Sequence, residues 1–248
     1  MKNARSDVAE ILDTVRRAGM VFQPIVDLAA WRVTGFEALA RFTDGSTPLG
    51  LLERAEAAGV REAAEIELIR AALTAADELP AGLSVTYNAS GTTILRPELA
   101  QLLTGSDRLW GLELFEAATA ADLGDVRAAV TRLGGLLLVD DAGAACADAS
   151  RITTLRPDVV KIDRGLFWKI DEDGAAREML GELLVAARDA GARLLVEGIS
   201  DAEQVERARG IGADLAQGFH LGVPTAPDRM PELLADLHRR IGVDAPGL

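Results

Sequence analysis

The feature that most constrains the fold of this chain is the alternation of short runs rich in Val, Ile and Leu with longer Ala/Leu/Arg/Glu stretches of helical periodicity. Such an alternation is typical of β/α units arranged around a parallel sheet. It predicts strands at residues 20–26, 33–37, 83–88, 110–114, 135–140, 158–162, 193–197 and 214–219. It predicts helices at residues 4–18, 61–78, 118–132, 175–190, 203–210 and 228–241, with Asp201 as an N-terminal cap.

The connection between the first two predicted strands, from Asp27 to Arg32, is too short for a crossover helix. These two strands are therefore expected to be antiparallel. A regular barrel of eight β/α units needs about 250 residues, and the chain has 248. The sequence predicts an α/β fold, a TIM-like (β/α)8 barrel variant with one antiparallel strand. Residues 1–248 are expected to form a single domain, because no Pro-, Gly- or Ser-rich linker interrupts them.

The charge balance and the apolar content narrow the range of partners. The chain carries 26 basic and 39 acidic residues, for a formal net charge of −13, and the acidic residues are spread along it. We therefore expect no DNA or RNA polymer as a partner. No run of 18 apolar residues is present, so neither a membrane segment nor a membrane partner is expected, and the predicted location is cytoplasmic. The lone cysteine, Cys146, excludes an internal disulfide and is best read as a small space-filling residue.

Polar side chains recur at or near the C-terminal ends of the predicted strands. One such carboxylate, taken singly, is more simply explained as a cap for the following helix. Seven strands that end this way predict a shared site, because barrel active sites form at the C-terminal ends of the strands. The residues are Glu37, Asn88, Glu113, Asp140, Asp141, Lys161, Glu197 and Gln217.

The acidic and amide members of this set offer only hard oxygen ligands, which favour Mg²⁺ or Mn²⁺ over Zn²⁺. Adjacent Asp140 and Asp141 diverge as their strand ends, so that one carboxylate can bridge two cations while the other binds one. Without cations, so many carboxylates in one pocket would repel one another and take up protons. His220 and His238 are too few for a histidine-based site. For His220 a surface position is favoured over one lining the mouth of the site after Gln217, and His238 is expected to be solvated on a helix.

Lys161 lies inside the apolar run Val159–Ile162, where an unpaired lysine is costly to bury. A structural interpretation is a salt bridge to Asp163 or to a neighbouring carboxylate. A functional interpretation is a cation that orients and polarises an attacking water.

An ordered series of motifs resembles the EAL-type phosphodiesterases, which act on cyclic-di-GMP. The resemblance begins with Phe22–Leu28 and with Gly35–Phe42, which contains Glu37-Ala38-Leu39, and it covers roughly residues 20–225. It continues through Asn88-Ala89-Ser90, Leu112–Glu116, Asp140-Asp141, Lys161-Ile162-Asp163, Glu197-Gly198-Ile199 and Gln217-Gly218-Phe219, and ends at Pro224.

The resemblance implies an enzyme that uses two Mg²⁺ or Mn²⁺ ions to open cyclic-di-GMP to linear pGpG, in bacterial second-messenger signalling. Glu37, Asn88, Glu113 and Asp140 would hold one metal, and Asp140, Asp141 and Glu197 the second. Lys161 would align the water, so that Lys161, Glu37 and Glu197 are the implied catalytic residues. Gln217 would support the site by hydrogen bonding beside the nucleotide, which Gln23, Leu39 and Arg41 would contact. Glu116 would steady the loop after the Asp-Asp pair.

Two segments depart from the family pattern. Where the family has Asp-Asp-Phe-Gly-Thr-Gly-Tyr-Ser-Ser, residues 140–148 read Asp-Asp-Ala-Gly-Ala-Ala-Cys-Ala-Asp, without the aromatic anchors. The altered loop, residues 142–148, implies reduced activity, because small misplacements of a catalytic group cost about 100-fold in rate. The segment Phe42–Pro48 lacks the family's tryptophan and its longer loop, which affects nucleotide affinity.

Three functions therefore remain open from the sequence. The first is an active hydrolase, indicated by the complete ligand set. The second is a catalytically weak or inactive EAL domain that serves as a cyclic-di-GMP receptor or protein-interaction module. The third is a barrel enzyme acting on another phosphoester or on a carbohydrate. A homodimer is compatible with the Ala/Leu-rich helices but not required by them.

Overall fold

The computed structural model describes residues 4–115, 123–143 and 149–245. Its strands are β1 Gly19–Asp27, β2 Arg32–Arg41, β3 Ser84–Ala89, β4 Trp110–Leu114, β5 Leu136–Ala142, β6 Val159–Ile162, β7 Arg193–Val196 and β8 Leu215–Ala216. Its helices are α1 Ala4–Arg16, α2 Pro48–Ala57, α3 Arg61–Ala76, α4 Gly91–Ile94, α5 Pro97–Thr104, α6 Leu123–Leu133, α7 Ala149–Leu155, α8 Arg164–Lys169, α9 Gly174–Ala190, α10 Ala202–Gly210 and α11 Met230–Ile241. Two 3₁₀ turns, η1 Phe219–Leu221 and η2 Pro227–Arg229, follow β8.

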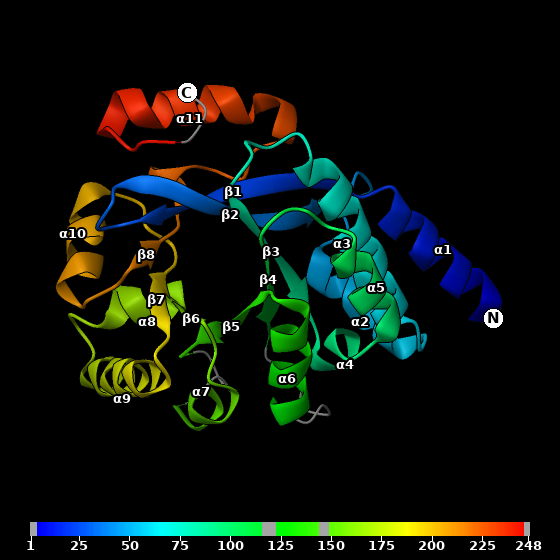
Figure 1. The fold of residues 1–248 in the computed structure, drawn as a ribbon, viewed down its shortest axis with the longest axis horizontal. Helices are drawn as coiled ribbons and strands as arrows, with labels where there is room; N and C mark the ends of the chain where they lie inside the picture. Colours follow the sequence, from blue (N-terminus) through cyan, green and yellow to red (C-terminus); the bar gives the residue numbers. More distant parts are fainter. Residues whose placement is uncertain (1–3, 116–122, 144–148, 246–248) are drawn as a thin grey trace.

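The eight strands close into a barrel in sequence order, with helices around it (Figure 1). β1 is antiparallel to both of its neighbours, β2 and β8, and every other neighbouring pair is parallel. The predicted fold class, a (β/α)8 barrel variant with one antiparallel strand, is confirmed. Asp201 is also confirmed as a cap, because its side chain accepts a hydrogen bond from the Gln204 backbone N–H.

Several predicted boundaries were wrong. β2 runs to Arg41 instead of ending at Glu37, because it stays paired with β1 beyond the last β2–β3 pair, Glu37 with Thr86. β8 contains only Leu215 and Ala216, so the predicted 214–219 strand ends early, and at Gly218 the chain passes so close to Ile199 that a Cβ atom would lie 2.2 Å from its backbone. The backbone then turns into η1.

The sequence analysis missed five helices, α2, α4, α5, α7 and α8. None of them has more than ten residues, so each is too short to show a sustained helical period. Thr47 starts α2 by accepting a hydrogen bond from the Gly50 N–H, and Pro48 follows as the first helical residue. The first five residues of the predicted helix 118–132 lie outside the described residues.

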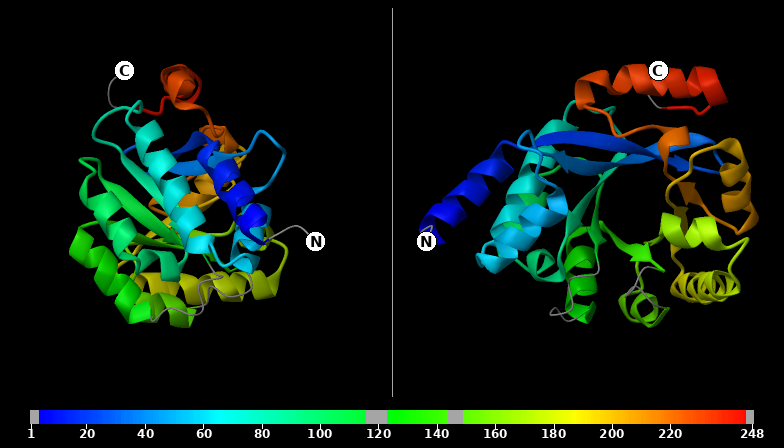
Figure 2. Two further views of the ribbon diagram at one scale, coloured as in Figure 1. Left: turned by 90° about the vertical axis from the view of Figure 1, so that its right-hand side faces the viewer. Right: turned by 180° about the vertical axis from the view of Figure 1, so that it is seen from behind.

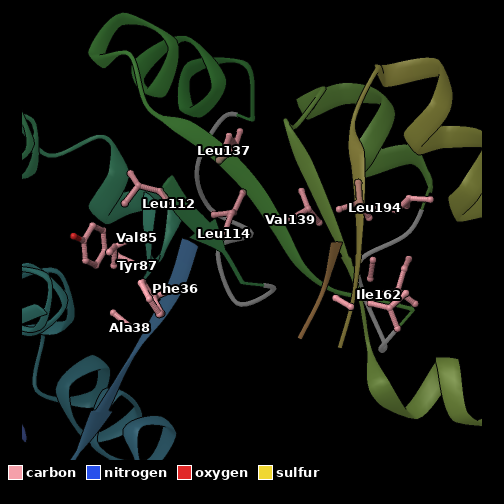
Figure 3. Close-up of a cluster of buried hydrophobic side chains, with 14 of the residues drawn as sticks. Phe36, Ala38, Val85, Tyr87, Leu112, Leu114, Leu137, Val139, Ile162 and Leu194 are labelled. Carbon is pink, nitrogen blue, oxygen red and sulfur yellow. The ribbon is translucent and has the colours of Figure 1, made fainter. Parts of the chain in front are cut away.

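The main hydrophobic core lies between the barrel wall and the helices (Figure 3). Side chains alternate along each strand, so that Leu137 and Val139 face this outer core while Leu138 between them faces the barrel interior. The interior layer is small and apolar and consists of Ile25, Leu138, Val159, Leu195 and Leu215. It forms a packed floor beneath the C-terminal ends of the parallel strands.

The two ends of the described chain pack on the outside of the barrel (Figure 2). Ile11 and Val15 of α1 join Leu51, Ala55 and Ala64 in a separate small core with α2 and α3. At the other end, α11 runs alongside the β1–β2 pair, and the Trp31 indole N–H donates to the Ile241 carbonyl at 2.8 Å. None of the described helices combines the length and the apolarity that a membrane span requires.

Candidate active site

The strand alternation that buries the apolar floor also builds a polar layer above it. Leu138, Val159, Leu195 and Leu215 of the floor are each followed two residues later by a polar residue on the same side of the strand. These residues are Asp140, Lys161, Glu197 and Gln217. β1 runs in the opposite direction, so its polar residue, Gln23, comes two residues before the floor residue Ile25. Glu37, Asn88 and Glu113 complete the layer.

Lys161 lies at the centre of this layer and is 1% exposed. Its Nζ lies 2.5 Å from Glu113 Oε2, 2.9 Å from Asp140 Oδ1 and 2.9 Å from Glu197 Oε1. Glu37 Oε1 lies 3.7 Å away. Four strands thus direct carboxylates at one ammonium group. Of the two structural partners considered for Lys161, the neighbouring carboxylates are correct and Asp163 is not, because Asp163 caps α8 through the Gly165 and Leu166 N–H groups.

Glu37 is fixed by neutral donors on its other side. Gln217 Nε2 donates to Glu37 Oε2 at 2.7 Å and to Gln23 Oε1 at 3.0 Å, while Gln23 Nε2 donates to the Gly222 carbonyl. Asn88 Nδ2 lies 3.4 Å from Glu37 Oε1. The predicted residues Gln23, Asn88 and Gln217 therefore belong to one hydrogen-bonded network with Glu37.

Thr86 is a member of the site that the sequence analysis missed. Its hydroxyl donates to Glu113 Oε1, opposite the oxygen that contacts Lys161, and both side chains are buried. Thr86 lies two residues before Asn88 on the same face of β3, so the period-two pattern contained the signal.

Asp140 and Asp141 lie side by side in β5, just before its last residue, Ala142. Asp141 has a positive φ of 53°, uncommon for a residue other than glycine, and its N–H donates to Asp140 Oδ1. Carboxylate oxygens of Asp140, Asp141 and Glu197 lie within 4.8 Å of one another. This is a set of hard oxygen donors of the kind that binds Mg²⁺ or Mn²⁺.

The charges of the site also fit divalent cations. Glu37, Glu113, Asp140, Asp141 and Glu197 carry five formal negative charges, and Lys161 neutralises one of them. The remaining four equal the charge of two divalent cations. The buried Gln217 Oε1, which has no hydrogen-bond partner, offers one more oxygen at the same place.

Other predicted residues lie farther from this centre. Leu39 is half-buried in the wall of a cavity described below, whereas Arg41 is exposed and donates to the Ala40 carbonyl. The contact of Leu39 and Arg41 with the nucleotide stays a prediction. Glu116 and most of the altered loop, residues 144–148, lie outside the described residues. His238 is exposed, as expected, and pairs with Asp244.

Two cavities flank the carboxylate layer, and Glu37 and Asp141 line both. The α8 cavity, of about 460 Å³, is bounded by Gln23, Asp163, Arg164, Trp168, Glu197, Gly198, Ile199, Ser200, Gln217, Gly218 and Phe219. The α3 cavity, of about 390 Å³, is more apolar and includes Leu39, Leu49, Leu52, Arg61, Asn88, Phe115 and Asp140. Both volumes are typical of small-molecule sites.

Burial and mutual repulsion dominate the electrostatics of the carboxylates in the absence of metal. Burial raises the pKa of Glu197 from its ordinary 4.5 to about 7, although Lys161 opposes the shift. Burial, followed by repulsion from Glu37, also raises the pKa of Glu113. The surrounding carboxylates outweigh the effect of burial on Lys161 and raise its pKa, so that it stays charged.

These shifts predict that the metal-free protein loses stability as the pH rises. A carboxyl whose pKa is higher in the folded than in the unfolded state binds its proton more tightly when folded. For Glu197 this stabilisation is complete below pH 4.5 and is lost as the pH rises through about 7. We expect the free energy of unfolding in chelator to fall by about 1–3 kcal/mol between pH 5 and pH 8. Urea unfolding at several pH values would measure it.

The matched variant is Glu197→Gln, which cannot ionise. Its stability should depend less steeply on pH than that of the wild-type protein, with the remaining slope due partly to Glu113. Identical pH profiles for the two proteins would contradict the assignment of the slope to Glu197.

The fold and this layer together define a class of protein: a (β/α)8 barrel variant with an acidic site at the C-terminal ends of its parallel strands. A family model described as "EAL domain" matches residues 9–224. The chain belongs to the EAL domain family.

Comparison with individual proteins agrees with this assignment. An uncharacterized protein of Azorhizobium caulinodans is 28% identical over 239 residues, covering 86% of this chain and 32% of the relative. The cyclic di-GMP phosphodiesterase TpdA of Vibrio parahaemolyticus is 26% identical over 216 residues, covering 84% of this chain and 37% of the relative. This chain thus spans about a third of the length of these relatives.

Among solved structures, a calcium/cyclic-di-GMP complex of Klebsiella pneumoniae BlrP1 superposes with a TM-score of 0.74 at 25% sequence identity. The alignment covers 85% of this chain and 56% of BlrP1.

Proposed function

We propose that this protein hydrolyses cyclic-di-GMP to linear pGpG with the help of two divalent cations, Mg²⁺ or Mn²⁺. The observation that carries the proposal is the surplus of carboxylates around the buried Lys161, placed between two cavities at the C-terminal ends of the strands of an EAL barrel. The names of TpdA and of the BlrP1 complex indicate the substrate class.

The site residues would bind the two cations in two groups that share Asp140. Glu37, Asn88, Glu113 and Asp140 would hold one cation, and Asp140, Asp141 and Glu197 the other. The cations would stabilise the negative charge that develops on the phosphoryl group and on the leaving oxygen. Gln217 would keep the Glu37 carboxylate in place through its 2.7 Å hydrogen bond.

Lys161 would take a second role once cations neutralise its carboxylate neighbours. Its ammonium group would then donate a hydrogen bond to the attacking water and hold it in line with one phosphorus. The water would attack that phosphorus and lose a proton, the bond to the 3′ oxygen would break, and that oxygen would take up a proton as the ring opens. In this role Lys161 would act as a hydrogen-bond donor and not as a base.

The experiment that tests the proposal is incubation of the purified protein with cyclic-di-GMP in chelator, Mg²⁺, Mn²⁺ or Ca²⁺, with the products separated by chromatography. We expect no pGpG in chelator and formation of pGpG after Mg²⁺ or Mn²⁺ is added. Binding measured in parallel separates the alternatives. Tight binding without product in Mn²⁺ would favour a receptor role, and neither binding nor product would reject cyclic-di-GMP as the ligand.

A further inference from the structure

We propose that the indole of Trp168 is a stacking platform for one guanine base of the cyclic dinucleotide, at the mouth of the α8 cavity. The inference rests on the proposed function and adds a residue that determines affinity for the base. Trp168 lies on α8, directly after β6, the strand that carries Lys161 (Figure 1). The ring is therefore separated by no more than the six-residue helix α8 from the carboxylate layer, where the phosphate of the ligand would bind.

The exposure of the aromatic side chains in this cavity supports the proposal. Trp168 is 46% exposed and Phe219 is 70% exposed, and both line the α8 cavity together with Glu197 and Asp141. Scattered exposed apolar residues are ordinary on protein surfaces. Two large aromatic side chains in the walls of one cavity with a charged floor match a ligand that has a planar base at one end and a phosphate at the other.

The indole is also held in a fixed orientation. Its Nε1–H donates to the Gly198 carbonyl at 3.2 Å, and the Arg164 guanidinium lies over the ring at 5.9 Å from the centroid. Gly198 has a positive φ of 73°, and a Cβ there would lie 2.5 Å from the Arg164 Cβ. Because Gly198 directly follows Glu197, the ring is tied to the strand end that carries a candidate metal ligand. A rigid aromatic surface binds a base with little loss of conformational entropy.

The chemistry of the ring suits a stacked base. Stacking of a base on an aromatic side chain accounts for roughly a 5- to 150-fold change in affinity. Arg164, whose guanidinium lies over the indole, also lines the cavity and adds positive charge to a wall that faces an anionic ligand. Phe219 provides a second apolar contact in the same cavity.

The test compares kinetics and binding for Trp168→Ala, Trp168→Phe and a control. In Mn²⁺ we expect Trp168→Ala to raise the KM for cyclic-di-GMP about ten-fold, with kcat nearly unchanged. Trp168→Phe keeps an aromatic face and should stay within about three-fold of the wild-type KM. Leu109→Ala serves as the control, because Leu109 is 67% exposed but lies next to the N-terminal end of β4. It should leave the KM unchanged.

Tryptophan fluorescence gives a readout that does not depend on turnover. The chain has three tryptophans, and neither Trp31 nor Trp110 lines the α8 cavity. Addition of cyclic-di-GMP in Ca²⁺, the cation of the BlrP1 complex, should quench the wild-type emission. The quench should disappear in Trp168→Phe and persist in Trp31→Phe.

Different results would contradict the stacking role of Trp168 and the proposed hydrolase function. If the wild-type protein hydrolyses cyclic-di-GMP while Trp168→Ala keeps the wild-type KM and Trp168→Phe keeps the quench, the stacking role is wrong and the proposed function stands. A loss confined to kcat would also overturn the stacking role. If the wild-type protein neither binds nor hydrolyses cyclic-di-GMP, both proposals are wrong.

Discussion

Replacing Lys161 with methionine is expected to abolish turnover and to destabilise the metal-free protein strongly. The ammonium is the buried counter-charge for Glu37, Glu113, Asp140 and Glu197. Removal of one partner from a buried ion pair costs about 3–5 kcal/mol, because the remaining charge is left uncompensated. We expect a loss of this size in chelator at pH 8, measured by urea unfolding. In Mn²⁺, turnover should fall at least about 1,000-fold, equivalent to about 4 kcal/mol of transition-state stabilisation.

The destabilisation should shrink under two conditions if its cause is electrostatic. Saturating Mn²⁺ supplies replacement positive charge, and a pH near 5 allows the carboxyls with raised pKa, Glu113 and Glu197, to be protonated. The double variant Lys161→Met/Glu113→Gln removes both members of the 2.5 Å pair and should regain part of the stability but none of the turnover. Wild-type stability of Lys161→Met in chelator at pH 8 would refute this explanation.

Replacing Glu37 with glutamine is expected to abolish turnover with little effect on the fold. The substitution keeps the size of the side chain and an oxygen that can accept the Gln217 hydrogen bond, but it removes one negative charge from the candidate metal site. Weaker cation binding removes stabilisation of the transition-state charge, so we expect turnover in Mn²⁺ to fall about 1,000-fold. The free energy of unfolding should change by no more than about 1 kcal/mol, since the loss of repulsion offsets the loss of contact with Lys161.

The matched control is Glu182→Gln on the exposed face of α9, which makes the same chemical change outside the carboxylate layer. It should leave turnover and metal dependence unchanged. Comparable turnover of Glu37→Gln and the wild-type protein at saturating Mn²⁺ would exclude Glu37 as a required ligand.

Most of the polar layer could be predicted from the sequence because strand alternation is a local property. The same spacing that places Leu138 and Val159 inside the barrel places Asp140 and Lys161 inside it two residues later. The antiparallel start of the barrel was also predictable, because a loop as short as Asp27–Arg32 permits no crossover helix. Thr86 obeys the same alternation, but it lies inside β3 and not at its C-terminal end, where active-site residues of barrels are expected.

The sequence alone determined the barrel, the direction of its first strand and the residue types of the carboxylate layer, since these follow from chain-local spacing and motif order. Only the tertiary structure decided that four carboxylates surround Lys161 and that Asp163 caps α8 instead of pairing with that lysine. It also placed Trp168 and Phe219 in one cavity. Which side chains meet across a barrel depends on the register between strands distant in sequence, and non-local packing of the whole core fixes that register.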